Sequence, residues 1–171
     1  MGAGEAHRQP MKRNPELRDL SEEHHYSLVA ARTLRLAAEG KRSLSDAVAA
    51  FWEQWEREIG PHFRSEEEML LPAFAGHPGS DALIARTLAE HAALRELTRS
   101  LPESAAETAR LLHAHIRFEE RELFPAIEAA LDGPALEALG CRLRERSAAQ
   151  PLSTSPRTDN PGPASSSRTP R

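Results

Sequence analysis

A twelve-residue segment that occurs twice carries the residue types that could do chemistry. Residues 62–73 and residues 115–126 both follow the pattern His-Φ-Arg-x-Glu-Glu-x-x-Leu-Φ-Pro-Ala, in which Φ is an apolar residue. In each copy the His precedes the first Glu by four residues, so His62 would share a helix face with Glu66, and His115 with Glu119. Imidazole and carboxylate groups are metal ligands, and two such pairs brought together could hold metal.

The polar residues of the repeat fall within apolar stripes, which repeat in steps of three and four residues and define one face of a helix. Three stripes contain buried polar residues in this way: Phe51, Trp55, Ile59, His62, Glu66 and Leu70; Ile84, Leu88, His91 and Leu94; and Leu112, His115, Glu119, Leu123 and Ala126. A buried carboxylate is costly unless it is paired or bound to metal. We therefore expect these side chains to share a cation.

A further imidazole comes from the segment Glu22-Glu23-His24-His25. A helical wheel places His24 with the leucines of the first predicted helix, and His25 nearer to Val29. This favours His24 as a ligand and leaves His25 as the alternative. The carboxylates beside the repeat ligands are expected to form a solvated acidic face, in which Glu67 or Glu120 could also support a ligand.

The elements that must position these residues are helices, because β-branched residues are few and no stretch alternates in the manner of a strand. The expected helices span about 16–38, 43–71, 80–100, 103–131 and a short fifth segment, 134–146. Ser43 is the expected N-cap of the second helix, Pro72 is expected to end it, and Gly60-Pro61 is expected to kink it. Short connections predict an all-α fold, an antiparallel up-down-up-down four-helix bundle over residues 15–146. We expect a flexible N-terminus (1–14) and a disordered tail (147–171).

In such a bundle the metal-ligand candidates lie at one depth. His62 and His115 each precede a proline by ten residues, while the first and third helices run the opposite way and bring His24 or His25, and His91, to the same level. Four imidazoles with two carboxylates able to bridge suit two ions. A nitrogen and oxygen ligand set without thiolate favours iron, with manganese or zinc also suitable.

Composition excludes several other classes of protein. The 171-residue chain has a formal net charge of −4, which does not indicate nucleic-acid binding, and its single cysteine excludes an internal disulfide and a Cys-based zinc site. Neither a membrane span nor a signal peptide is evident, so we expect a soluble cytoplasmic protein with no membrane partner.

The chain resembles the hemerythrin-like (HHE cation-binding) family over about residues 15–131. The resemblance is carried by the Glu-His-His of the first helix, Glu90-His91, and the two repeat copies with their Glu-Glu and Leu-Φ-Pro elements. It implies a four-helix bundle with an oxo- or hydroxo-bridged di-iron centre. His24 or His25, His62, His91 and His115 would be terminal ligands, and Glu66 and Glu119 would bridge.

One position departs from the oxygen-carrying members, which have a fifth His four residues from the third-helix His. Here Arg95 and Thr87 stand four residues on either side of His91. The leading hypothesis is a protein that binds or senses O2, NO or peroxide at a di-iron centre. The alternatives are an enzyme that turns over peroxide or NO, an iron-storage or iron-sensing protein, and a helical bundle without metal. The sequence identifies no redox partner.

Overall fold

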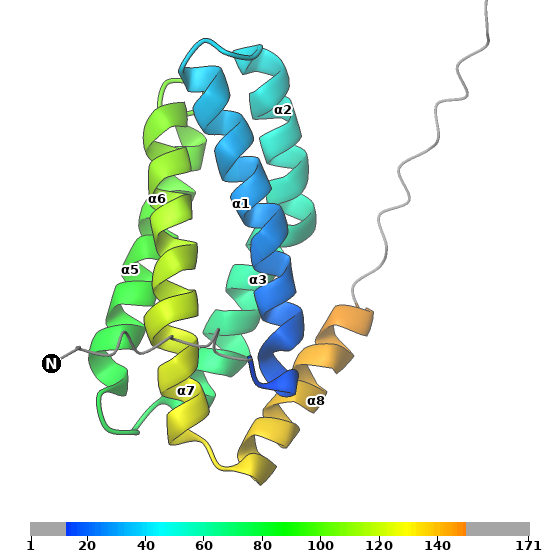
Figure 1. Ribbon diagram of the computed structural model, residues 1–171, viewed down its shortest axis with the longest axis vertical. Helices are drawn as coiled ribbons and strands as arrows, with labels where there is room; N and C mark the ends of the chain where they lie inside the picture. Colours follow the sequence, from blue (N-terminus) through cyan, green and yellow to red (C-terminus); the bar gives the residue numbers. More distant parts are fainter. Residues whose placement is uncertain (1–12, 150–171) are drawn as a thin grey trace, which may run out of the picture.

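The computed structural model describes residues 13–149, which are helical almost throughout and contain no strand (Figure 1). The expected flexible segment 1–14 and the expected disordered tail 147–171 therefore lie mostly outside the described residues. Within the described range no helix is both long enough and apolar enough to cross a membrane.

The helices begin and end close to the predicted positions. A short 3-10 turn, η1 (Pro15–Leu17), leads into α1 (Arg18–Ala38). The second predicted helix is a continuous series: α2 (Leu44–Gln54), η2 (Trp55–Ile59), α3 (Gly60–Ser65), η3 (Glu66–Leu70) and α4 (Leu71–Phe74). The remaining elements are α5 (Ser80–Arg99), α6 (Ala105–Phe118), η4 (Glu119–Leu123), α7 (Phe124–Ala130) and α8 (Gly133–Ala149). Ser43 is the N-cap of α2 as predicted, and its hydroxyl accepts a hydrogen bond from the amide of Asp46.

The prediction that Pro72 ends the second helix is wrong, because the chain stays helical to Phe74. The three segments η2, η3 and η4 are π-helical, and each is followed by a residue and then a proline: Pro61, Pro72 and Pro125. A proline inside an α-helix removes one hydrogen bond and clashes with the preceding turn. The wider π turn, in which the amide of the residue before each proline bonds to the carbonyl five residues back, allows the helix to continue.

The π turns also change which side chains face inward beyond them. Phe124 and Ile127 are fully buried after η4, whereas the predicted Ala126 is only partly buried.

On α5 the predicted stripe residue Leu88 is 43% exposed, and Thr87 is buried in its place. The Thr87 hydroxyl donates a hydrogen bond to the backbone carbonyl of Leu83, which satisfies the buried hydroxyl.

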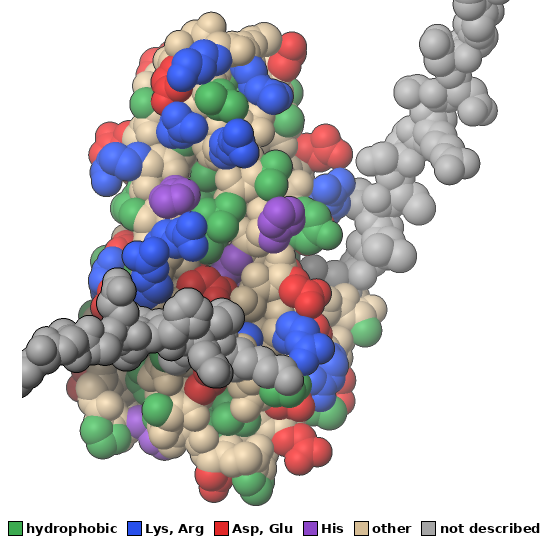
Figure 2. Space-filling model, in the orientation of Figure 1, with side chains coloured by type: hydrophobic (Ala, Val, Ile, Leu, Met, Phe, Trp, Pro, Cys, Tyr) green, Lys and Arg blue, Asp and Glu red, His purple; other side chains and the backbone are tan. Residues whose placement is uncertain are grey.

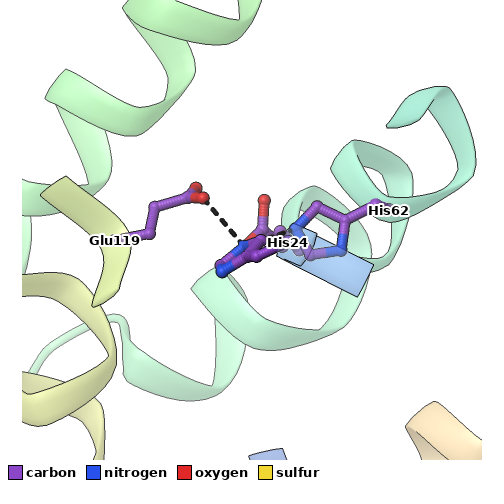
Figure 3. Close-up of side chains that lie close together, drawn as sticks. His24, His62 and Glu119 are labelled. Atoms are coloured by element: carbon purple, nitrogen blue, oxygen red, sulfur yellow. Dashed lines mark hydrogen bonds and ion pairs between the residues drawn. The ribbon is translucent and has the colours of Figure 1, made fainter. Parts of the chain in front are cut away.

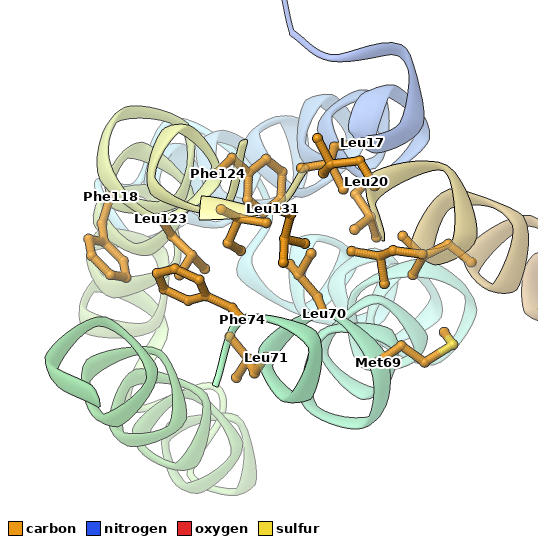
Figure 4. Close-up of a cluster of buried hydrophobic side chains, with 14 residues drawn as sticks. Leu17, Leu20, Met69, Leu70, Leu71, Phe74, Phe118, Leu123, Phe124 and Leu131 are labelled. Atoms are coloured by element: carbon orange, nitrogen blue, oxygen red, sulfur yellow. The ribbon is translucent and has the colours of Figure 1, made fainter. Parts of the chain in front are cut away.

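The hydrophobic core is divided into two clusters, one toward each end of the molecule. One cluster, shown in Figure 4, contains side chains of η1, α4, α7 and α8, among them Leu17, Phe74, Phe124 and Leu139. The other is built by α1, α2, α3, α5 and α6, and includes Leu34, Phe51, Leu94 and Leu112. Along α1 the order is Leu20 in the first cluster, then the buried polar residues His24 and Ser27, then Ala31 in the second. The polar layer therefore lies between two apolar clusters.

The helices that supply the polar layer are neighbours in space. Helix α1 packs along α2 and α6, and α5 packs along α6 (Figure 1). Helix α8 contacts η1 and η3, and closes the end of the first cluster with Leu136, Leu139 and Leu143. Gly140 lies close to Glu16 at this contact, since a Cβ atom there would lie 2.0 Å from the carboxylate of Glu16 and would displace that side chain.

Candidate metal centre

Six buried polar side chains converge in the layer between the two apolar clusters. They come from α1, α3, η3, α5, α6 and η4: His24, His62, Glu66, His91, His115 and Glu119, each no more than 2% exposed. Their ligand atoms form two groups, each within 4.8 Å: His24 and His62 with both glutamates, and His91 and His115 with both glutamates. The six candidates thus lie together, whereas His25 lies outside the cluster, exposed and edge-on to Tyr26.

Each glutamate has one oxygen toward each pair of imidazoles. Glu66 Oε1 lies 3.4 Å from His62 Nε2, and its Oε2 lies 3.3 Å from His91 Nε2. Glu119 Oε2 lies 3.2 Å from His24 Nε2 (Figure 3), and its Oε1 lies 2.9 Å from His115 Nε2. Both carboxylates therefore span the two halves of the cluster. Each is also the first residue of a π turn, η3 for Glu66 and η4 for Glu119, and π turns are frequent at functional sites.

A carboxylate on a neighbouring element contacts the outer nitrogen, Nδ1, of each imidazole. Glu120 accepts from His24 at 2.6 Å, and Glu23 accepts from His62 at 2.7 Å. In the other half, Glu67 and Glu90 accept from His91 and His115 respectively, each at 2.8 Å. Such a contact holds the proton on Nδ1 and directs the Nε2 lone pair into the cluster, the arrangement typical of metal-binding histidines.

These four supporting carboxylates follow a simple rule in the sequence. Each is adjacent in the chain to a cluster residue: Glu23 to His24, Glu67 to Glu66, Glu90 to His91 and Glu120 to Glu119. Sequence reasoning considered a supporting role for Glu67 and Glu120 only, and missed Glu23 and Glu90. The signal was a glutamate directly beside four of the six buried ligand candidates. Each of these glutamates contacts the histidine of another helix, so the pairing also depends on which helices are neighbours.

The charge distribution indicates that the cluster is incomplete without a cation. The Nε2 atoms of His24 and His62 lie 3.0 Å apart, and those of His91 and His115 lie 3.1 Å apart. Within the described residues, the four oxygens of Glu66 and Glu119 are buried and accept no hydrogen bond. Lone pairs facing one another at these distances repel unless a positive charge lies among them. The donor set therefore fits a metal ion in each half.

In the absence of metal, protons on the imidazoles supply the positive charge. Burial opposes protonation of His115, but the negative charge of Glu119 outweighs it and raises the pKa of His115 to about 9. The pKa values of His24, His62 and His91 are also raised, since carboxylate contacts again outweigh burial. Burial disfavours the charged form of Glu119, yet the nearby His115 holds the pKa of Glu119 well below its usual range.

Two aromatic rings enclose the imidazoles. Phe63 stacks on His91 with ring centroids 3.8 Å apart and lies edge-on to His115, while Phe124 stacks on His24 at 5.2 Å. Both phenylalanines are fully buried. They exclude water from the cluster, which strengthens electrostatic interactions inside it.

One further residue near His91 lies beside the cluster rather than in it. Arg95, which follows His91 by four residues, pairs with Glu67 at 2.9 Å. Its guanidinium has no acceptor atom and cannot ligate a cation. Arg95 instead anchors the carboxylate that supports His91, and holds the pKa of Glu67 below its usual value despite the opposing effect of burial.

Comparisons with known proteins agree with this arrangement. Searches of curated proteins and of solved structures gave no match. The family model of the hemerythrin HHE cation binding domain matches residues 16–127, which is more than half of the chain and contains all six cluster residues. The chain therefore belongs to the hemerythrin HHE cation-binding family.

Proposed function

We propose that the six clustered residues bind two metal ions, with Glu66 and Glu119 bridging them. One ion would be held by His24 and His62, and the other by His91 and His115. The observation that carries this proposal is the orientation of the two carboxylates. Each carboxylate directs one oxygen toward each pair of imidazoles, and all four oxygens are buried without a hydrogen-bond donor among residues 13–149. A single ion would leave one imidazole pair and two carboxylate oxygens uncompensated.

We propose iron as the metal. Each half of the cluster offers two imidazole nitrogens and two carboxylate oxygens, and it offers no thiolate. A structural zinc site is commonly closed by four tetrahedral ligands and rarely shares two carboxylates with a second ion. Manganese is the nearest alternative on ligand type, and metal analysis distinguishes the two.

The site is also suited to a small ligand such as O2, NO or peroxide. Four protein ligands for each ion leave positions free on a metal that prefers six. A cavity of about 70 Å³ adjoins the cluster, with Glu23, Pro61 and His62 in its lining. That volume holds a few water-sized molecules. When bound, iron would supply the redox chemistry and the binding position, while the protein holds the imidazoles neutral and keeps water out.

The positions of the six clustered residues along the helices also support a bundle topology. We propose an up-down-up-down arrangement of four helical units, namely α1, α2 to α4, α5, and α6 to α7. The first and third units meet the cluster that contains Leu17 before they reach the polar layer, and the second and fourth meet it afterwards. Antiparallel units therefore contribute ligands at one level, each with apolar packing above and below.

Iron quantification tests the proposal. Protein reconstituted with iron(II), exposed to air and desalted should contain about two irons per chain, and Glu66→Ala and Glu119→Ala should each lose at least one. Glu68→Ala, which removes an exposed carboxylate from the same turn as Glu66, is the matched control and should retain both. Full iron content in both bridging variants would show that the assignment is wrong.

Ligand binding is tested separately on the iron(II)-loaded protein under argon. Addition of NO should change the visible absorption spectrum and saturate at a fixed ratio of NO to protein. An unchanged spectrum in protein that contains two irons would rule out the proposed small-ligand role while leaving the metal assignment intact.

A further inference from the structure

A groove lies between α1 and α6, and it is lined by residues of these helices other than the six of the metal cluster. Its volume is about 450 Å³, which is within the usual range for small-molecule sites. Helix α1 contributes Leu28, Ala31, Arg32 and Arg35 to its lining. Figure 2 shows Lys and Arg side chains gathered on this face, over the upper parts of the two helices.

The groove exists because small residues face one another where the helices cross. Ala31 of α1 and Ala109 of α6 are each 2% exposed, and together with Leu28 they form an apolar floor. On α6 the lining continues with Arg110, His113 and Arg117, spaced by three and four residues along one helix face. The rim is therefore cationic on both helices, and no acidic residue of the described part of the chain lines the groove.

Two of the four arginines have no counter-charge. Arg35 pairs with Glu39, and Arg110 approaches Glu107 at 3.7 Å. Arg32 and Arg117, one from each helix, form no ion pair and no side-chain hydrogen bond with any residue of the range 13–149. A guanidinium stays charged at physiological pH and presents paired N–H donors that match a carboxylate or phosphate group. Cations placed together without an anion are unfavourable, so the arrangement favours an anionic ligand.

We propose that this groove binds a small amphiphilic organic anion, such as a medium-chain carboxylate. The anionic head would contact one of these two arginines, and the apolar body would lie over Leu28, Ala31 and Ala109. Four residues of each helix line the groove, spread over positions 28–35 of α1 and 109–117 of α6, which gives it a length of about 10–12 Å. A ligand with charge alone would leave the apolar floor in water, and an uncharged one would leave the arginines unpaired. This site does not depend on the metal centre.

Isothermal titration calorimetry on the full chain tests the proposal, with decanoate as the probe. Decanoate should bind at one site per chain, and more weakly as potassium chloride is raised, because salt screens exposed charges. Butyrate and inorganic phosphate carry the charge without the apolar body, and should bind about tenfold more weakly or not detectably. Absence of decanoate binding, or tighter binding of a poly-glutamate peptide than of decanoate, would overturn the assignment.

A matched pair of double variants locates the binding. Arg32→Gln with Arg117→Gln should weaken decanoate binding about fivefold, as expected for the loss of an exposed ion pair with the carboxylate. Arg121→Gln with Arg142→Gln removes the same charge from exposed positions outside the groove and should leave the affinity unchanged. Equal affinities in the two double variants would overturn the proposal. Iron content should be the same in both, so failure here is distinguishable from failure of the metal assignment.

Discussion

The metal-free protein should become less stable as the pH rises from about 6 to about 9.5. His115 titrates near pH 6.5 in the unfolded chain and near pH 9 in the folded one, so between these values the folded state holds a proton that the unfolded state has released. The resulting stabilisation is fully present below pH 6.5 and is lost as the pH rises through about 9. The pKa values of His24, His62 and His91 are raised as well, which gives the same sign.

The magnitude follows from the same shift. A rise in the pKa of His115 from 6.5 to about 9 corresponds to about 3 kcal/mol of unfolding free energy, because each pKa unit corresponds to about 1.4 kcal/mol. The opposing group, Glu119, is ionised in both folded and unfolded states throughout this range and does not change the slope. The iron-loaded protein should behave in the opposite way, because metal competes with protons for the imidazoles and binds more tightly as the pH rises.

Urea unfolding of chelator-treated protein, followed by circular dichroism at about pH 6 and about pH 9.5, measures this effect. His115→Gln should flatten the dependence by about 3 kcal/mol, whereas His113→Gln, which changes an exposed imidazole two residues away, should retain it. Stability that is constant or rises with pH in the metal-free protein, or a full slope in the His115 variant, would refute the reasoning.

Three further outcomes are expected. Glu90→Gln removes the negative charge that supports His115 and should weaken iron binding about tenfold in a competition assay with a chelator. Glu90→Ala should approach a hundredfold loss in the same assay. Glu96→Gln, an exposed change on the same helix, is the control and should have no effect. Phe63→Ala should lower the free energy of unfolding by about 3–5 kcal/mol in urea titrations, because it removes a fully buried ring stacked on the cluster. Ser43→Ala should cost about 1 kcal/mol by loss of a helix cap, with iron content unchanged.

The helices could be predicted from the sequence because helix periodicity, turn residues and helix caps are local features. The phase of the apolar stripes, together with the repeat, also selected the six side chains that lie together, since a buried His or Glu in an apolar stripe must find a partner. The helical wheel favoured His24 but left His25 as the alternative, and their different burial depends on how α1 packs against α2 and α6. The choice is therefore a tertiary property.

The π turns were the main feature that sequence reasoning missed. A proline was taken as a helix stop, yet at Pro72 a π turn immediately before it relieves the clash and the helix continues. The same turn begins at Glu66, and its counterpart before Pro125 begins at Glu119. In both cases the Glu stands five residues before the residue that precedes the proline, and this spacing is the local signal for the π turn. Its effect on the facing of side chains depends on packing in the whole helix.

The central claim is that Glu66 and Glu119 bridge two metal ions, and anomalous diffraction at the iron absorption edge tests it most directly. Crystals of the iron-reconstituted protein should show two separate peaks in the anomalous difference map. One should be bounded by His24 and His62 and the other by His91 and His115, with both carboxylates in contact with both peaks. A single peak, or no peak among the six residues in protein that has bound iron, would contradict the account.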